Sequence, residues 1–166
     1  MDSYLQRLHT SVTSAANGMT PTQLNQRREG KWSVAEILEH LYNSYTGTIK
    51  GMDRCLATGK PQGRARTIKE RAQVFLVIEA GYFPSGRKAP EISLPRGLAP
   101  DEVVKQIGAK ILAMDEAITR CEARYGRRAL ILTHPILGPL TARQWRKLHW
   151  LHGQHHLKQI TGLLVS

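Results

Sequence analysis

The stretch SVAEILEHLYNSYTGTIKGM, residues 33–52, indicates the kind of fold that this chain adopts. Ser33 followed three residues later by Glu36 is the pattern of a capping box, in which two side chains satisfy backbone N–H groups at a helix start. Apolar residues then recur at the spacing of one helical face: Val34, Ile37, Leu38, Leu41, Tyr45, Ile49 and Met52. We therefore predict a long amphipathic helix over residues 33–57, ended by the sequence TGKPQG.

Three other long segments show the same periodicity. The first covers residues 2–17, and the third covers residues 101–125. The last begins at residue 141, where Thr141 and Gln144 repeat the capping-box pattern, and continues to the end of the chain. We expect four long helices with apolar faces that must pack against one another.

The segment between the second and third long helices is long and rich in proline. We expect one shorter helix over residues 67–80 and otherwise irregular structure, and we leave residues 129–132 as loop rather than strand. Short links alternating with one long connection are typical of a bundle with a crossover. The prediction is a single domain over residues 1–166, all-α, a four-helix bundle with a long crossover connection between the second and third long helices.

Composition and charge narrow the classes of function. The chain has 166 residues, 41% of them hydrophobic, which suits one globular domain. It lacks both an apolar run of about 18 residues and a signal peptide, so we expect a cytoplasmic protein that does not enter a membrane. The net charge of +11 favours anionic ligands. Nucleic acid is not expected, because the basic residues are scattered and form no recognition motif.

Four of the seven histidines lie in LHWLHGQHHLKQI, residues 148–160. His152 and His156 are four residues apart, so they are neighbours on one helical face, and the periodicity turns that face inward. Two imidazoles at this spacing can bind one metal ion, although the pattern alone is weak. It is not a metalloprotease motif, because Gly153 stands where the general-base glutamate would be.

A third ligand has to come from another helix, and His40 is the main candidate. Periodicity places it on the flank of the second helix beside small residues, which indicates either a cavity at the edge of the core or a half-exposed surface histidine. His149 is an inward-facing alternative, and His155 lies at the edge of the stripe. We expect Glu39, the nearest acid, to face solvent.

The residues around these histidines resemble the DinB/YfiT-like superfamily. WSVAEILEHL, residues 32–41, is similar to its second-helix signature. HPILGPLTARQWRKLHWLHGQHHLKQI, residues 134–160, is similar to its last-helix signature, and FPSGRKAPEISLP, residues 83–95, resembles the crossover loop of one subgroup. The resemblance implies a four-helix bundle, often a homodimer, with a divalent metal held by His40, His152 and His156. Lys158, directly before Gln159, replaces the glycine that is usual at this position in the superfamily.

The resemblance implies that the metal is nickel, zinc, iron or manganese, and that some relatives transfer low-molecular-weight thiols. Independently, three neutral imidazoles leave a coordination position open, which is the pattern of a catalytic rather than a structural site. The expected function is a metal-dependent thiol S-transferase or hydrolase that acts on a small, anionic thiol substrate. The alternative is a non-catalytic, stress-related binding module in which the metal is structural or absent.

Overall fold

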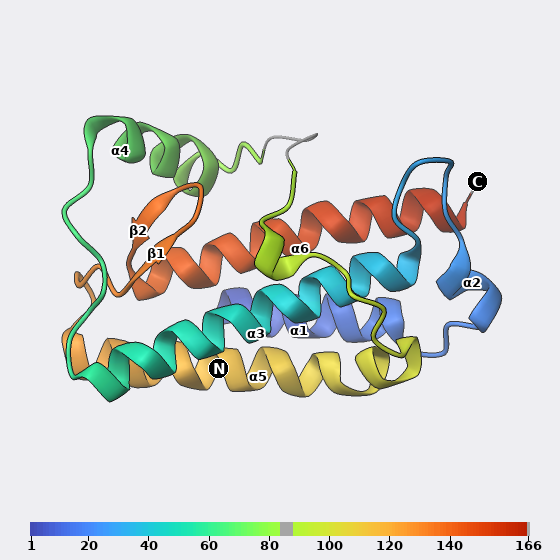
Figure 1. The fold of residues 1–166 in the computed structure, drawn as a ribbon, viewed down its shortest axis with the longest axis horizontal. Helices are drawn as coiled ribbons and strands as arrows, with labels where there is room; N and C mark the ends of the chain where they lie inside the picture. Colours follow the sequence, from blue (N-terminus) through green and yellow to red (C-terminus); the bar gives the residue numbers. More distant parts are fainter. Residues whose placement is uncertain (84–87, 166) are drawn as a thin grey trace.

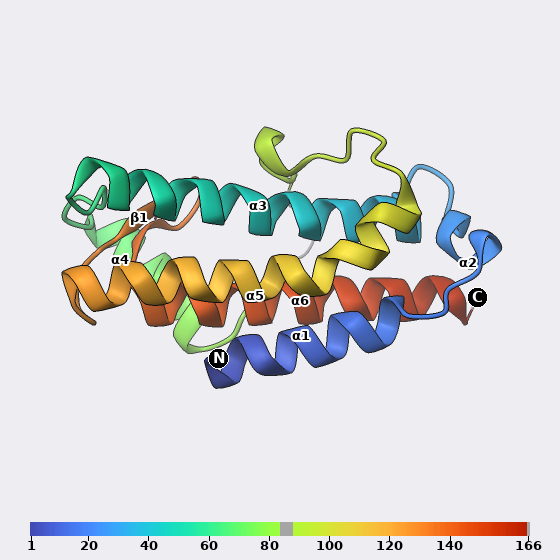
Figure 2. The same ribbon diagram turned by 90° about the horizontal axis from the view of Figure 1, so that it is seen from below.

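Four long helices lie side by side in the computed structural model, which describes residues 1–83 and 88–165 (Figure 1 and Figure 2). They are α1 (Ser3–Ala16), α3 (Val34–Thr58), α5 (Pro100–Tyr125) and α6 (Ala142–Leu164). A short helix, α2 (Pro21–Asn25), links α1 to α3. The chain is thus predominantly helical, as its sequence predicts. None of the helices in the described part is long and apolar enough to cross a membrane.

The capping residues set the helix starts. The Ser33 hydroxyl accepts from the N–H of Glu36, and the Glu36 carboxylate accepts from the N–H of Ser33 at 2.7 Å. The same reciprocal pair joins Thr141 and Gln144 at the start of α6. At the other end of α3, Gly59 adopts a left-handed conformation with φ of 70°, which a residue with a side chain rarely takes. The predicted helix boundaries are therefore close to those observed.

The apolar faces of the long helices form one core. The stripes predicted for α1 and α3 are buried, apart from Ile49, which is half-buried. On α5 the buried residues are Val103, Ile107, Ile111, Met114 and Ile118. Leu112, on the same helix, is 46% exposed. Helix α5 packs against α1, α3 and α6, and α1 also packs against α6.

The expectation of a chain without strands is wrong in one place. Strands β1 (Leu132–His134) and β2 (Gly138–Leu140) form a small antiparallel hairpin before α6, in which Leu132 pairs with Leu140. Strands of three residues are too short to show an alternating pattern in sequence. Within the turn, Nδ1 of His134 accepts hydrogen bonds from the backbone N–H groups of Ile136 and Leu137 at 3.2 Å.

The connection between α3 and α5 carries three short elements. They are α4 (Ile68–Val74), the π-helix η1 (Phe75–Glu79) and the 3-10 helix η2 (Glu91–Ser93). The helix predicted over residues 67–80 is therefore present, but it changes to π-helix halfway. Element η2 packs on α3, and η1 packs on α6. Residues 84–87 of the segment 83–95 lie outside the described part. The connection thus brings residues from the middle of the chain over α3 and α6.

Candidate metal centre

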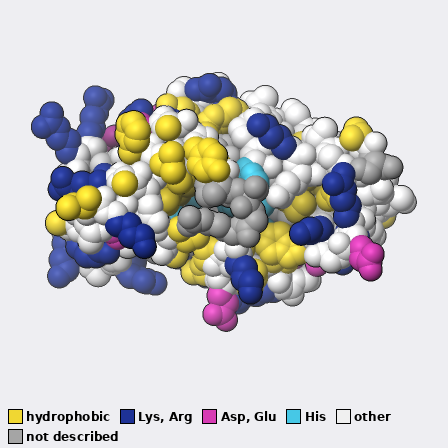
Figure 3. Space-filling view, turned by 90° about the horizontal axis from the view of Figure 1, so that it is seen from above, with side chains coloured by type: hydrophobic (Ala, Val, Ile, Leu, Met, Phe, Trp, Pro, Cys, Tyr) yellow, Lys and Arg dark blue, Asp and Glu magenta, His cyan; other side chains and the backbone are white. Residues whose placement is uncertain are grey.

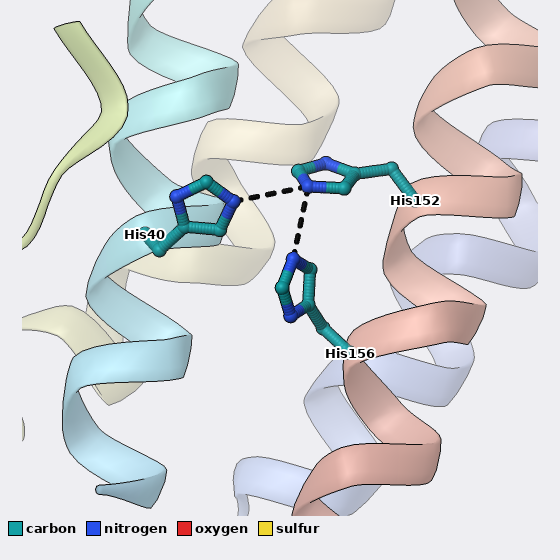
Figure 4. Close-up of side chains that lie close together, drawn as sticks. All are labelled: His40, His152 and His156. Carbon is teal, nitrogen blue, oxygen red and sulfur yellow. Dashed lines mark hydrogen bonds between the residues drawn. The ribbon is translucent and has the colours of Figure 1, made fainter. Parts of the chain in front are cut away.

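His40, His152 and His156 come together although more than a hundred residues separate the first from the others. His40 lies on α3, and the other two lie on adjacent turns of α6, with their imidazoles turned toward His40 (Figure 4). The Nε2 atom of His152 is 3.0 Å from Nε2 of His40 and 3.0 Å from Nε2 of His156. One nitrogen of each ring lies within 4.8 Å of the other two.

A backbone carbonyl sets the tautomer of His40. Its Nδ1 lies 2.9 Å from the carbonyl oxygen of Ser93, at the end of η2. A carbonyl can only accept a hydrogen bond, so Nδ1 carries the proton of the neutral ring. Nε2 of His40 therefore presents a lone pair toward the other two histidines.

A side-chain amide does the same for His156. Its Nδ1 lies 2.8 Å from Oε1 of Gln159, one turn further along α6, and this oxygen accepts the proton. Both His40 and His156 thus direct an Nε2 lone pair at Nε2 of His152. That atom has at most one proton to donate, so two contacts of hydrogen-bond length share one proton. A cation would satisfy the cluster better than the available protons do.

Burial keeps the three imidazoles neutral. His40 is 2% exposed and His156 is 8% exposed. Loss of solvation lowers the pKa of His40, against a smaller raising effect of the Ser93 carbonyl. Desolvation, reinforced by the neighbouring His40, lowers the pKa of His156 to about 3, and the pKa of His152 falls well below 6.5 for the same first reason. Neutral imidazole is the form that binds metal.

The donor set fits a divalent transition metal. Imidazole nitrogens bind such ions at about 2.1 Å, so two nitrogens at a right angle on one ion lie about 3 Å apart. The observed separation of 3.0 Å for each contact with His152 matches that arrangement. Histidine ligands usually donate their other N–H to an oxygen that fixes the ring, and Ser93 and Gln159 supply such oxygens here.

Aromatic rings enclose the three histidines and border a large cavity. The Trp32 ring lies 5.1 Å from that of His40, and the Phe83 ring stacks on His152 at 5.7 Å, measured between ring centroids. The cavity has a volume of about 1050 Å³ and is lined by α3, α6, β1 and the segment around η2. The three imidazoles form part of its wall, so a small molecule entering the cavity can reach them.

One protein-family model covers nearly the whole chain. A family model described as "Protein of unknown function (DUF1569)" matches residues 5–162, which include all three histidines. The chain belongs to the DUF1569 family. No curated protein and no solved structure matches it.

The remaining candidate histidines of this DUF1569 protein lie outside the three-histidine group. His149 is 3% exposed, and its Nε2 bonds to the Thr48 hydroxyl at 2.9 Å, whereas its Nδ1 has no partner among the described residues. His155 is half-buried, and its Nε2 contacts the amide nitrogen of Gln159 at 3.1 Å. His40 itself is buried and lines the cavity, so the first of the two positions that periodicity allowed for it is the observed one.

Glu39, the acid next to His40 in the sequence, is buried rather than exposed. Glu39 was expected to face solvent, but it is 3% exposed and accepts from the backbone N–H groups of Arg96 and Gly97 at 2.6 and 3.1 Å. It thereby anchors the end of the crossover connection on α3. The roles of the Ser93 carbonyl and of Phe83 were missed, because a carbonyl carries no sequence signal and the connection has no periodicity.

Proposed function

We propose that this DUF1569 protein binds a divalent metal ion through His40, His152 and His156 and that it is a metal-dependent enzyme. The observation that carries the proposal is the convergence of three Nε2 atoms, two of which lie 3.0 Å from the third. Two of the rings are oriented by oxygen acceptors on their far nitrogens. Such support is characteristic of metal-ligating histidines.

Three protein ligands leave coordination positions for water or substrate. When bound, the ion acts as a Lewis acid and lowers the pKa of a coordinated water or thiol toward neutrality. The chain contributes the orientation of the rings, through the Ser93 carbonyl and Gln159, and the cavity that admits the substrate. The reaction class that we propose is thiol S-transfer or hydrolysis.

We also propose that the architecture is a four-helix bundle with a crossover of the DinB/YfiT-like type, and that the protein is a homodimer. Support comes from the four long helices lying side by side and from the long connection between α3 and α5, in which the segment around η2 lines the cavity. Further support is the resemblance of residues 32–41 and 134–160 to that superfamily, which implies the same three histidines as metal ligands.

Metal analysis of protein purified without an affinity tag tests the site directly. We expect about one divalent ion per chain. The double variant His152→Ala, His156→Ala is expected to lose it, and His40→Ala is expected to weaken binding strongly. His149→Ala is the matched control, because it removes a buried histidine of the same helix that lies outside the group.

Two outcomes would contradict this proposal. Native protein that neither contains nor takes up a divalent ion would remove the metal site. Loss of the ion in His149→Ala with retention in His40→Ala would show that the ligands are assigned wrongly. Once metal is bound, a panel of low-molecular-weight thiols with an electrophilic acceptor distinguishes an enzyme from a structural metal site.

A further inference from the structure

The cavity beside the three histidines is lined by cations and by no acid in the described part of the chain. Its basic lining residues are Arg28, Lys31, Lys50, Arg54, Lys88 and Lys158. Lys31, Lys50, Arg54, Lys88 and Lys158 form no ion pair with a carboxylate among the described residues. Figure 3 shows Lys and Arg side chains on several sides of the histidines on this face. The field in the cavity therefore favours an anionic ligand.

Four of these six cations form two groups. Lys31 and Lys158 are close in sequence to Trp32 and His156, beside the three-histidine group. Lys50 and Arg54 are four residues apart on one face of α3. At a rise of about 1.5 Å per residue they lie about 15 and about 21 Å along the helix from His40. The second pair is thus separated from His40 by about three to four turns of α3.

The wall between these two groups combines aliphatic surface with polar side chains, among them Ser44 and Thr48. Val77, Ile92, Leu132 and Leu148 contribute aliphatic surface. Gly51 allows the Leu132 side chain to pack closely against α3 there, since a Cβ atom on it would overlap that side chain. His149 also lines the cavity, and its buried Nδ1 is unpartnered among the described residues.

An unpartnered polar atom in a protein interior costs about 1–3 kcal/mol, so native structures usually supply it with a partner. The hydroxyl of Thr48 already engages the other nitrogen of the ring. A hydrogen-bonding group of a ligand that lies beside His149 in the cavity would supply Nδ1 with a partner. This second observation is the one that an extended ligand, reaching from the three histidines past His149, would explain.

We propose that the substrate of this site is an elongated amphiphilic anion. Its donor atom binds at the metal, its apolar middle lies along the aliphatic wall past His149, and its anionic end lies at Lys50 and Arg54. Only one part of this proposal, the binding of the donor atom at the metal, rests on the proposed function. The cavity wall and the distant cations supply the length and the charge that the ligand must have.

A series of ligands of increasing length measures this geometry. Protein loaded with Co(II) is titrated with mercaptopropionate, mercaptohexanoate and mercaptoundecanoate, and with the uncharged mercapto-alcohol of each length, following the thiolate-to-cobalt absorption. For the short pair we expect at most a small preference for the acid, due to Lys31 and Lys158 beside the three histidines, that does not depend on Lys50 and Arg54. For a longer pair we expect the acid to bind about five- to tenfold more tightly, as an ion pair with two cations allows.

The variant Lys50→Gln, Arg54→Gln is expected to abolish that preference while leaving the affinity for the alcohols unchanged. The matched control is Lys69→Gln, Arg127→Gln, which removes the same charge from exposed residues that do not line the cavity. An acid preference that is independent of length, or that survives in the Lys50/Arg54 variant, overturns the proposal. Failure of Co(II) to bind would instead contradict the proposed function, so the two failures are distinguishable.

Discussion

At the scale of single residues, the candidate site depends on groups that hold the histidines as much as on the histidines themselves. Gln159 is exposed, yet its Oε1 accepts the proton of His156 Nδ1 and so fixes which nitrogen faces the cluster. Groups of this kind change metal affinity about 10- to 100-fold when they are removed. The periodicity of α6 could not assign this role to an exposed residue.

Replacing Gln159 by leucine is therefore expected to weaken metal binding about 10- to 100-fold without abolishing it. The free energy of unfolding of the metal-free protein should change little, because the side chain is exposed. Competition titration of the metal against a chromophoric chelator provides the measurement. Gln154→Leu, on the same helix and outside the three-histidine group, should bind metal like the wild type. Equal affinities for the two variants would show that Gln159 does not support the site.

At the scale of elements, the position of α6 depends on a close approach to α1. Gly153 stands between His152 and His156, and a Cβ atom on it would overlap the Leu8 side chain, which is fully buried. The glycine that excludes a metalloprotease motif therefore has a packing role. It allows α6 to lie against α1 while its histidines face α3.

Gly153→Ala is expected to destabilise the fold by about 1–2 kcal/mol, because overpacking of the core costs more than the gain in helix propensity. Gly162→Ala is the control on the same helix. In the described part of the chain, no atom beyond its neighbours and the backbone of its own helix lies within 4 Å of the added Cβ, so this variant should gain up to about 1 kcal/mol. Denaturant unfolding of both variants measures the difference. Similar stabilities would contradict the close packing of α1 against α6.

At the scale of the whole molecule, a basic protein keeps several histidines neutral in its interior. Desolvation lowers the pKa of His134 to about 4, and desolvation with the nearby His134 lowers that of His149 to about 3. Both values lie below the value of about 6.5 expected in the unfolded chain. As pH falls below 6.5 the unfolded state takes up protons first, so the folded state loses stability progressively down to these lower values.

Between pH 7 and pH 5, His134 alone should contribute a loss of about 2 kcal/mol in the free energy of unfolding. His134→Asn should remove that contribution, since asparagine does not titrate and its side-chain oxygen can still accept from the backbone of the turn. Urea unfolding of both proteins at the two pH values, with a chelator present, gives the comparison. Identical pH dependence would show that His134 is not held neutral by the fold.

The sequence by itself determined the elements whose causes are local. Capping boxes and apolar periodicity involve residues a few positions apart, so the starts, lengths and buried faces of α3 and α6 could be predicted, together with the inward direction of His152 and His156. Periodicity left His40 undecided between cavity and surface, and it placed Glu39 in solvent. Only the tertiary structure decided these points, because the burial of both residues is created by residues 91–97, which fold over α3 from a connection without periodicity. The hairpin before α6 and the cations at the far end of the cavity likewise depend on contacts between distant segments.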